Sequence, residues 1–326
     1  MARRRGSPWT GLSAIFLKEF ADHLGGARMM ILEWLMLLTG VGAVYTAIQD
    51  LRQTTSQDPF LFLRLFTQSH VFGDSQESLP SFTGILGFLI PLVAIGLAFD
   101  SINGEFNRRT MSRILAQPIY RDALLLGKFL AGLSTLAVAL LALWLLVMGL
   151  GLVTLGVPPT GEEVLRGLAF LIVAIAYGGV WLAASLLFSV VFRSPATSAL
   201  SGLGLWLLMS VLWPMLTRFL TEALFASQSA ALMGGQSLEQ IEVQQGLARL
   251  SPDTLFGEAL QGILHPATRA LGPVFLDQLQ NAILGAPLPF IQSLLLIWPQ
   301  VTGLVAGAIL LFVITYVIFQ RQEVRA

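Results

Sequence analysis

Cysteine is absent from this sequence of 326 residues, and charged residues are scarce. The lack of cysteine excludes disulfides, thiolate metal sites and cysteine nucleophiles. Only 12% of the residues are charged, against about 25% in a typical soluble domain. The formal net charge is zero, so no basic surface for nucleic acid is expected.

Motifs for nucleotide binding and for common enzyme classes are also missing. Gly127-Lys128 is followed by Phe129 and position 122 is Asp, so the phosphate loop Gly-x4-Gly-Lys-Ser/Thr is not formed. His-Glu-x-x-His and Gly-x-Ser-x-Gly do not occur. The three histidines are far apart in sequence. We therefore expect no catalytic residues, no metal ligands and no directly bound cofactor.

Apolar residues are abundant: they make up 55% of the chain, and the mean hydropathy is +0.74. A soluble chain of this length could not bury so much apolar surface, so lipid must cover part of it. About twenty apolar residues are needed to cross a membrane as a helix. Six runs meet this length, at 29–48, 82–99, 124–155, 165–192, 197–216 and 291–319. The sequence therefore predicts an all-α integral membrane protein with six transmembrane helices.

Two details of these runs bear on function. Pro299 is expected to break or kink the sixth run. Glu33 and Asp100 lie near the predicted membrane boundary, and no acidic or basic residue is predicted at mid-membrane. Because intramembrane charge is the usual mark of a proton or ion pathway, this argues against a proton-coupled carrier.

Basic and acidic-leaning connections alternate along the chain. Arginines and lysines gather before the first run, between the second and third, at Arg193, and in the tail after residue 319. Residues 50–80 and 217–290 lean acidic. By the positive-inside rule both termini are cytoplasmic. Arg3-Arg4-Arg5 is not followed closely by an apolar core, so no cleaved signal is expected.

The predicted organisation has three parts: an N-terminal segment 1–28, a transmembrane domain 29–319 and a cytoplasmic tail 320–326. Residues 9–28 are predicted to form an interfacial helix, the alternative being a mobile tail. Its apolar face would comprise Leu12, Ile15, Phe16, Phe20 and Leu24. The external connection 50–80 is expected to hold a short helix near 59–67. The external loop 217–290 is expected to form re-entrant or interfacial helices, one starting at Ser251-Pro252-Asp253.

The connection 101–122, between the second and third runs, has a distinctive pattern. Glu105 stands at helical spacing from Arg108 and Arg109, an apolar stripe follows, and Pro118 is a natural stop. This pattern predicts a short amphipathic cytoplasmic helix fixed between two membrane helices. A plain solvated basic loop is the alternative that the pattern alone leaves open.

The same segment resembles the signature of ABC-2 type transporter permeases, especially the branch similar to the permease of nitrous-oxide-reductase maturation. The matching residues are Gly104-Glu105, Arg108-Arg109, Thr110, Ile114-Leu115, Gln117-Pro118, Arg121 and Leu125-Leu126-Gly127-Lys128. The N-terminal Lys18-Glu19 segment and the six-helix layout are also similar. The chain departs from the pattern at 106–109, where the branch usually has an acidic-basic mix ending in glycine.

The resemblance implies an ABC-2 (type V exporter-like) permease in the cell membrane of a bacterium or archaeon. Such a subunit moves substrate, usually outward, with two copies of a separate ABC ATPase that binds ATP and Mg²⁺. A second permease copy, identical or related, and membrane lipid would complete the assembly, with room for an extracytoplasmic accessory protein. A membrane anchor for an ATPase-driven assembly machine and a membrane-embedded lipid-modifying enzyme are the alternatives. The residues expected to couple to the ATPase are Asn103, Gly104, Glu105, Arg108, Arg109, Thr110, Met111, Ile114, Gln117 and Pro118.

Overall fold

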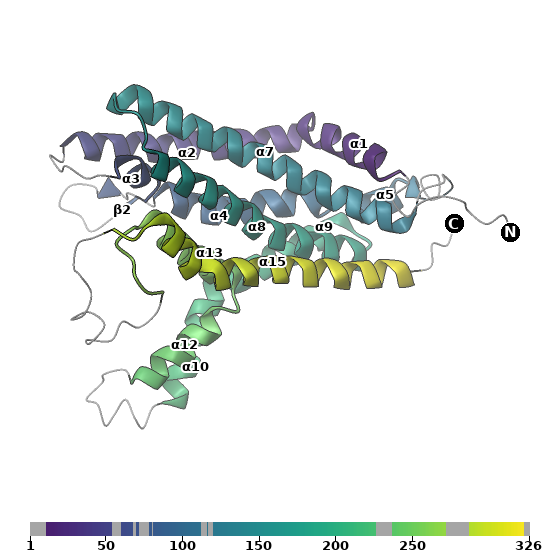
Figure 1. Ribbon diagram of the computed structural model, residues 1–326. Coiled ribbons are helices and arrows are strands. Elements are labelled where there is room, and N and C mark those ends of the chain that lie inside the picture. The colour runs from purple at the N-terminus through teal and green to yellow at the C-terminus, as the bar shows by residue number, and fades with distance from the viewer. Residues whose placement is uncertain are drawn as a thin grey trace.

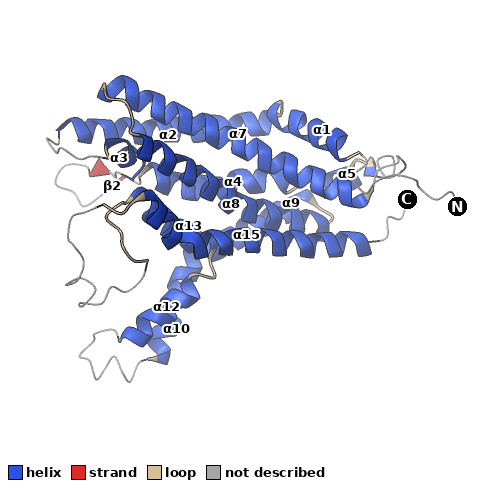
Figure 2. Ribbon diagram, viewed as in Figure 1, coloured by secondary structure: helices blue, strands red, loops and turns tan. Residues whose placement is uncertain are grey.

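The fold is a bundle of helices (Figures 1 and 2). The computed structural model describes residues 11–53, 60–67, 70–71, 78–79, 81–111, 116, 120–225, 237–271 and 287–322. Within these, two short strands, β1 (His70–Val71) and β2 (Ser78–Leu79), pair antiparallel. Every other regular element described is helical.

Six helices are long and apolar enough to cross a membrane, which confirms the predicted class. They are α2 (Ala27–Gln53), α4 (Phe82–Ala98), α7 (Arg121–Leu155), α8 (Gly161–Val191), α9 (Pro195–Leu207) with its continuation through η1 (Leu208–Leu212) and α10 (Trp213–Leu224), and α15 (Phe290–Arg321). Local sequence sets their ends: Ser81 caps α4, Thr160 and Glu163 form a capping box on α8, and Gly156 ends α7 with a left-handed backbone.

Helix α8 is the centre of the bundle. It packs against α15, α4 and α7, and its aromatic residues Phe170, Tyr177 and Trp181 are at most 2% exposed. The α9–α10 segment and α15 instead leave large apolar side chains uncovered, as at Leu200 (71% exposed) and Phe219 (68%). Such faces suit contact with lipid.

The expected break at Pro299 is not found, because α15 runs unbroken from Phe290 to Arg321. A proline inside a helix removes one donor, which would have served the carbonyl four residues earlier. Within a membrane bundle, neighbouring helices compensate for such a loss, so the segment stays helical.

One end of the bundle gathers segments that are far apart in sequence (Figure 1). Here lie α1 (Leu12–Leu24), α5 (Asn103–Asn107), the start of α7 and the end of α15. The guanidinium of Arg121 donates to the carbonyl of Gln322 at 3.1 Å, and Gln320 donates to Asp122. We call this the α5 end and the opposite one the far end. The predicted basic connections therefore share one end, and its cytoplasmic side remains a prediction.

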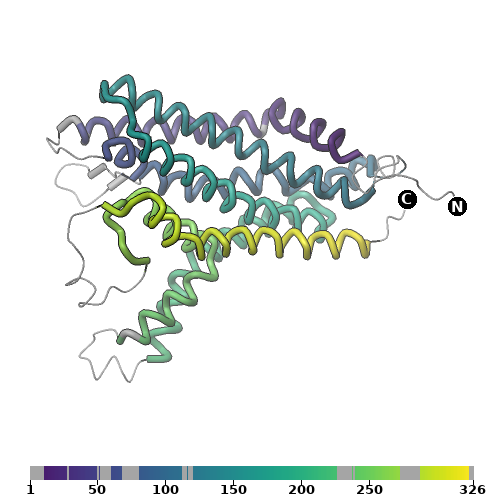
Figure 3. Tube along the Cα trace, viewed as in Figure 1, coloured from purple at the N-terminus to yellow at the C-terminus, as the bar shows by residue number. Residues whose placement is uncertain are grey.

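The far end is built from α3 (Leu61–Thr67), α12 (Leu238–Ala248) and α13 (Pro252–Leu264). Helix α13 begins at Pro252 and is capped by Ser251, as the sequence predicts. It packs against α8 and α15, so it re-enters the bundle. Helix α12 instead pairs with α10, and the two lean away from the other helices (Figure 3).

A fully buried arginine joins separate segments at the far end through an ion pair and hydrogen bonds. Arg166 of α8 is 0% exposed and pairs with Glu162 at 2.8 Å. Its remaining donors reach the carbonyls of Ile263 and Leu288, each at 2.6 Å. Charge-assisted bonds of this kind are the strong ones, so Arg166 fastens the end of α13 and the start of α15 to α8.

The re-entry of α13 also bears on one expectation. Asp253, in the first turn of α13, is hydrogen-bonded to the hydroxyl of Tyr177, near the midpoint of α8. The sequence placed no acidic residue securely at mid-membrane, and Asp253 lies beside the middle of α8. Asp253 was assigned to the external loop, and only the tertiary fold carries it inward.

Candidate functional site

Helix α1 lies along the first turns of α7. Ile15 is buried at 7% exposure, and its Cγ2 stands 2.8 Å from where a Cβ on Gly127 would be. The missing side chain at Gly127 is thus what lets α1 approach α7. Phe16 and Phe20 stack with ring centroids 5.7 Å apart, whereas Leu24, expected on the same apolar face, is 41% exposed.

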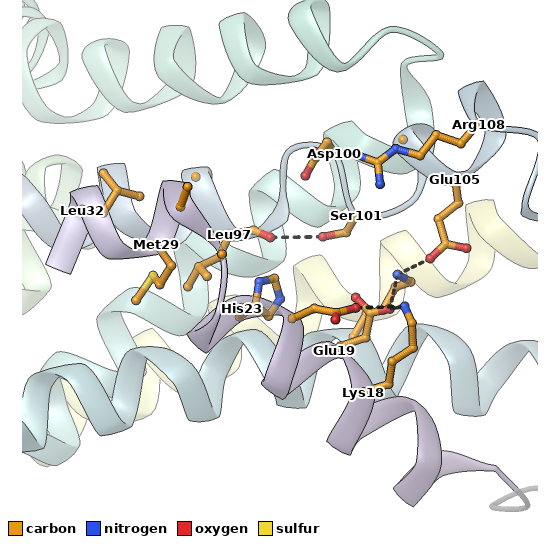
Figure 4. Close-up of a pocket in the computed structure, with 16 residues that line it drawn as sticks. Lys18, Glu19, His23, Met29, Leu32, Leu97, Asp100, Ser101, Glu105 and Arg108 are labelled. Carbon is orange, nitrogen blue, oxygen red and sulfur yellow. Dashed lines mark hydrogen bonds and ion pairs between the residues drawn. The ribbon is translucent and has the colours of Figure 1, made fainter.

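A single buried lysine joins three elements at the α5 end. The Lys128 side chain on α7 is 3% exposed, and its Nζ lies 2.9 Å from Oε1 of Glu19 on α1 and 2.7 Å from Oε1 of Glu105 on α5. Figure 4 shows both carboxylates pointing to the same place from separate elements. Two anions around one buried cation leave no uncompensated positive charge. Lys128 therefore fixes α1 and α5 to α7.

Helix α5 ends in a Schellman arrangement. The N–H of Thr110 donates to the carbonyl of Glu105 at 3.0 Å, and the N–H of Arg109 donates to that of Phe106 at 3.0 Å. Arg109 takes the left-handed position of this motif with φ 55°, and it is the sole non-glycine residue with positive φ among those the structure describes. Glycine is the usual residue there. The departure at 106–109 thus places an exposed arginine where the similar permeases usually have glycine.

The other side of α5 is bonded to the end of α8. The N–H of Ile102 donates to Oγ of Ser189 at 3.0 Å, and the Asn103 amide donates to the carbonyl of Phe192 at 3.3 Å. At the tip, the amide of Asn107 donates to the carbonyl of Arg193 at 3.1 Å. Helix α5 is thereby held by α7 and α8 together, and a force on it would reach both.

A cleft of about 380 Å³ opens between α1, α4 and α5. Its polar lining includes Lys18, His23, Asp100 and Arg108 beside the buried Lys128 (Figure 4). Burial lowers the pKa of His23, against the opposing charge of Glu19. Burial alone would raise the pKa of Glu19, but the charge and hydrogen bond of Lys128 outweigh it and the pKa is lowered. No group of three His, Asp or Glu side chains within the described ranges is arranged to hold a metal ion.

The residues predicted to couple to an ATPase separate into an inner and an outer set. Asn103, Gly104 and Met111 are buried, whereas Arg108 and Arg109 are exposed at the tip. Glu105 was expected to pair with these arginines and instead pairs with Lys128, because the buried ammonium offers the closer, less hydrated partner. Thr110 closes the helix through its hydroxyl, which donates to the carbonyl of Glu105 at 3.1 Å. Ile114, Gln117 and Pro118 lie outside the described residues.

Three residues of this site were not predicted: Glu19, Asn107 and Lys128. Glu19 and Lys128 stand in the motifs on which the resemblance rests, Lys18-Glu19 and Gly127-Lys128. A lysine just inside an apolar helix was the available signal, since a buried ammonium must find a carboxylate. What the sequence could not show is that one lysine serves both acidic motifs.

Comparison with known proteins finds a matching family and related permeases. A sequence model described as ABC-2 family transporter protein matches residues 13–324. The chain is 29% identical over 204 residues to a probable ABC transporter permease protein NosY of Pseudomonas aeruginosa, a match that covers 61% of this chain and 65% of that protein. It is 31% identical over 143 residues to the NosY of Stutzerimonas stutzeri, covering 42% and 50%. The matched segments thus span less than two thirds of these relatives.

Proposed function

Since the chain belongs to the ABC-2 family of transporter proteins, we propose that it is the membrane-spanning permease subunit of an ABC exporter. Its ATPase is a separate polypeptide that docks on the α5 end. ATP and Mg²⁺ bind to that partner. Two permease copies enclose the pathway, with lipid around them, and one ATPase docks beneath each copy.

The observation that carries the proposal is the bonding of Lys128 to Glu19 and Glu105. A docked partner that displaces the tip of α5 must also move α1 and α7, because the buried pairs resist separation. The bonds of Ile102 and Asn103 to α8 carry the same displacement into the central helix. Helix α5 therefore transmits movement of a soluble partner to the bundle.

The exposed tip of α5 is basic. Arg108 and Arg109 face solvent at the tip, and guanidinium groups bind carboxylates in bidentate pairs. We expect them to bind acidic side chains of the ATPase. ATP binding and hydrolysis then shift the permease between inward- and outward-facing states, through the different affinity of each state for the nucleotide-bound ATPase. Segments of 217–290 gate the exit at the far end.

The test is reconstitution of the permease with its co-purifying ATPase in lipid vesicles. The double variant Arg108→Glu, Arg109→Glu should lose ATPase stimulation by the permease. Arg218→Glu, an exposed arginine of α10, is the matched control and should keep it. Unchanged stimulation in the double variant would reject the contact. A membrane anchor would stimulate the ATPase without ATP-driven transport into the vesicles, and a lipid-modifying enzyme would act without nucleotide.

A further inference from the structure

A proline leaves one carbonyl of α4 without its helical donor. In an α-helix the carbonyl of Gly87 would accept from the N–H of residue 91, but residue 91 is Pro91, inside α4, which has no N–H. Gly87 instead accepts a hydrogen bond from the hydroxyl of Tyr177 at 3.0 Å. A carbonyl inside a membrane bundle must find such a donor.

Tyr177 supplies this donor from the middle of α8. It lies 16 residues after Gly161 and 14 before Val191, which is about 24 Å and about 21 Å from the helix ends at 1.5 Å per residue. Its side chain is 0% exposed and its ring stacks on Phe256 of α13, with centroids 4.3 Å apart. The phenol is therefore fixed between α4, α8 and α13.

The same phenolic oxygen is hydrogen-bonded to Oδ1 of Asp253. A tyrosine hydroxyl has one proton to donate, and the carbonyl of Gly87 can only accept. If Tyr177 donates to Gly87, the bond to Asp253 needs its proton from the carboxyl group. An ionised Asp253 would take the phenolic proton for itself and leave the Gly87 carbonyl unsatisfied. The hydrogen-bond count closes when Asp253 is a neutral carboxylic acid.

The other carboxyl oxygen fits this assignment. Oδ2 of Asp253 accepts from the hydroxyl of Ser210 at 2.9 Å and from that of Ser251 at 3.3 Å. Ser210 lies in η1, the π-helical stretch that precedes Pro214. The donors then run in one direction, from Ser210 to Asp253 to Tyr177 to Gly87. This chain of hydrogen bonds links α4, α8, η1 and α13, and α4 contains a proline within the helix.

Asp253 also has a route for proton exchange. It lines a second cleft of about 380 Å³ at the far end, between α4 and α13. Polar groups continue along the cleft: they are Thr67, Ser81, Thr83, Gln261 and His265. Water in such a cleft can deliver a proton to Asp253 and accept it back.

We propose that Asp253 is a proton-binding site within the bundle, neutral while α13 is docked, whose proton release into the far-end cleft undocks α13. Release transfers the carboxyl proton to water and leaves a carboxylate. The carboxylate then takes the single proton of Tyr177, which leaves the Gly87 carbonyl of α4 without a donor and places an anion between α8 and α13. Because a carboxylate is costly to keep away from water, its hydration in the cleft favours the undocked position of α13. Uptake of a proton reverses the step. This proposal does not depend on the ATPase contact.

In the described part of the chain, the elements that pack around Asp253 carry few charged or titratable residues. Helix α4 and η1 carry no charged residue, and the charged or titratable residues of α15 are Tyr316 and Arg321, near the α5 end. On α13, Glu258 forms an ion pair with Arg249, the residue that follows α12, with 2.9 Å between Oε2 and Nε. The remaining titratable groups on α13 and on the elements beside it are Arg64 of α3, Arg166 with Glu162 and Glu163 at the start of α8, Tyr177 and His265.

Infrared spectroscopy of the purified chain in lipid nanodiscs tests the protonation directly. At neutral pH the wild type should show the C=O stretch of a protonated carboxyl, and the Asp253→Asn variant should lack it. Glu258→Gln, which removes an ion-paired carboxylate from the same helix, should keep the band. Tyr177→Phe should keep the band but shift its frequency, because the carboxyl loses its acceptor. No band difference between wild type and Asp253→Asn would overturn the proposal.

The release step has its own test in this cysteine-free chain. Ala259 of α13 is 0% exposed, so Ala259→Cys reports whether α13 is docked. Labelling of this thiol by maleimide should increase with pH by more than ionisation of the thiol alone would cause. In the Asp253→Asn background, where the amide donates to Tyr177 at every pH, that excess should vanish. Equal labelling in both backgrounds across the pH range would overturn the release step.

Discussion

The Cγ2 atom of Ile15 lies 2.8 Å from where a Cβ on Gly127 would stand, so α1 rests on α7 at a contact that only glycine permits. Lys128 follows at once and bonds to Glu19, one turn beyond Ile15 on the same helix. Gly127 and Lys128 thus act as a pair: the glycine sets the spacing of the two helices and the lysine fixes their register.

Gly127→Ala should separate α1 from α7. The added methyl group meets Ile15 at a distance that real Cβ atoms do not tolerate, and overpacking of this kind costs about 1–3 kcal/mol. We expect a lower melting temperature of the purified permease and weaker stimulation of the ATPase. Adding Ile15→Ala makes room for the methyl group and should restore both. If Gly127→Ala alone behaves as wild type, the contact is not tight in solution.

Lys128→Met should be strongly destabilising. It removes the cation and leaves Glu19 and Glu105 facing one another, and breaking a buried pair costs roughly 3–5 kcal/mol. Adding Glu19→Gln and Glu105→Gln removes the repulsion, so thermal stability should recover. ATPase stimulation should stay low in the triple variant, because the bonds that join α1, α5 and α7 are gone. Full stimulation in the triple variant would show that Lys128 serves stability alone.

Arg109→Gly should separate backbone strain from function. A non-glycine residue with φ near 55° costs about 1–2 kcal/mol relative to glycine, so the variant should melt at a slightly higher temperature. Its ATPase stimulation should nevertheless fall, because the guanidinium is lost. Arg109→Lys, which keeps a cation at the same strained position, is the control for charge. A more stable variant with full stimulation would mean that Arg109 makes no functional contact.

The α5 end should lose stability on acidification in two stages. Burial lowers the pKa of His23 below its ordinary 6.5, so the unfolded chain takes up that proton first and stability falls below this pH. Lys128, working against burial, lowers the pKa of Glu19 below its ordinary 4.5, so a second loss follows at lower pH. Melting temperatures measured across this range should show both stages. His23→Gln should reduce the first stage, to which the imidazole of His265 at the far end also contributes because partial burial lowers its pKa, and should leave the second.

The elements that carry strong local signals could be predicted from sequence. The six apolar runs are helices long enough to cross a membrane, and Ser251-Pro252 starts α13 where the capping signal placed it. The sequence also showed that Glu105, Arg108 and Arg109 stand in one connection, between the second and third apolar runs. These features depend on composition and on residues a few positions apart, which a single sequence displays.

The features that were missed depend on contacts across the fold. The short distance between Glu105 and Arg108 suggested a local pair, but burial of Lys128 favoured a partner 23 residues away. The sequence allowed a re-entrant helix starting at Ser251-Pro252-Asp253, but local hydropathy could not show that α13 brings Asp253 to Tyr177. The role of Pro91 was equally hidden, since the Gly87 carbonyl that it leaves without a helical donor accepts from Tyr177, 90 residues after Gly87.

The most direct test of the central claim is a cross-linking measurement on the assembled complex. In this cysteine-free chain, Arg108→Cys at the tip of α5 would carry a thiol-linked benzophenone, with exposed Gly257→Cys at the far end as the matched control. Arg109 keeps a cation at the tip in the first variant. On illumination, the probe at position 108 should cross-link to the ATPase and the probe at 257 should not. A complex that co-purifies intact yet cross-links from 257 and never from 108 would contradict the account.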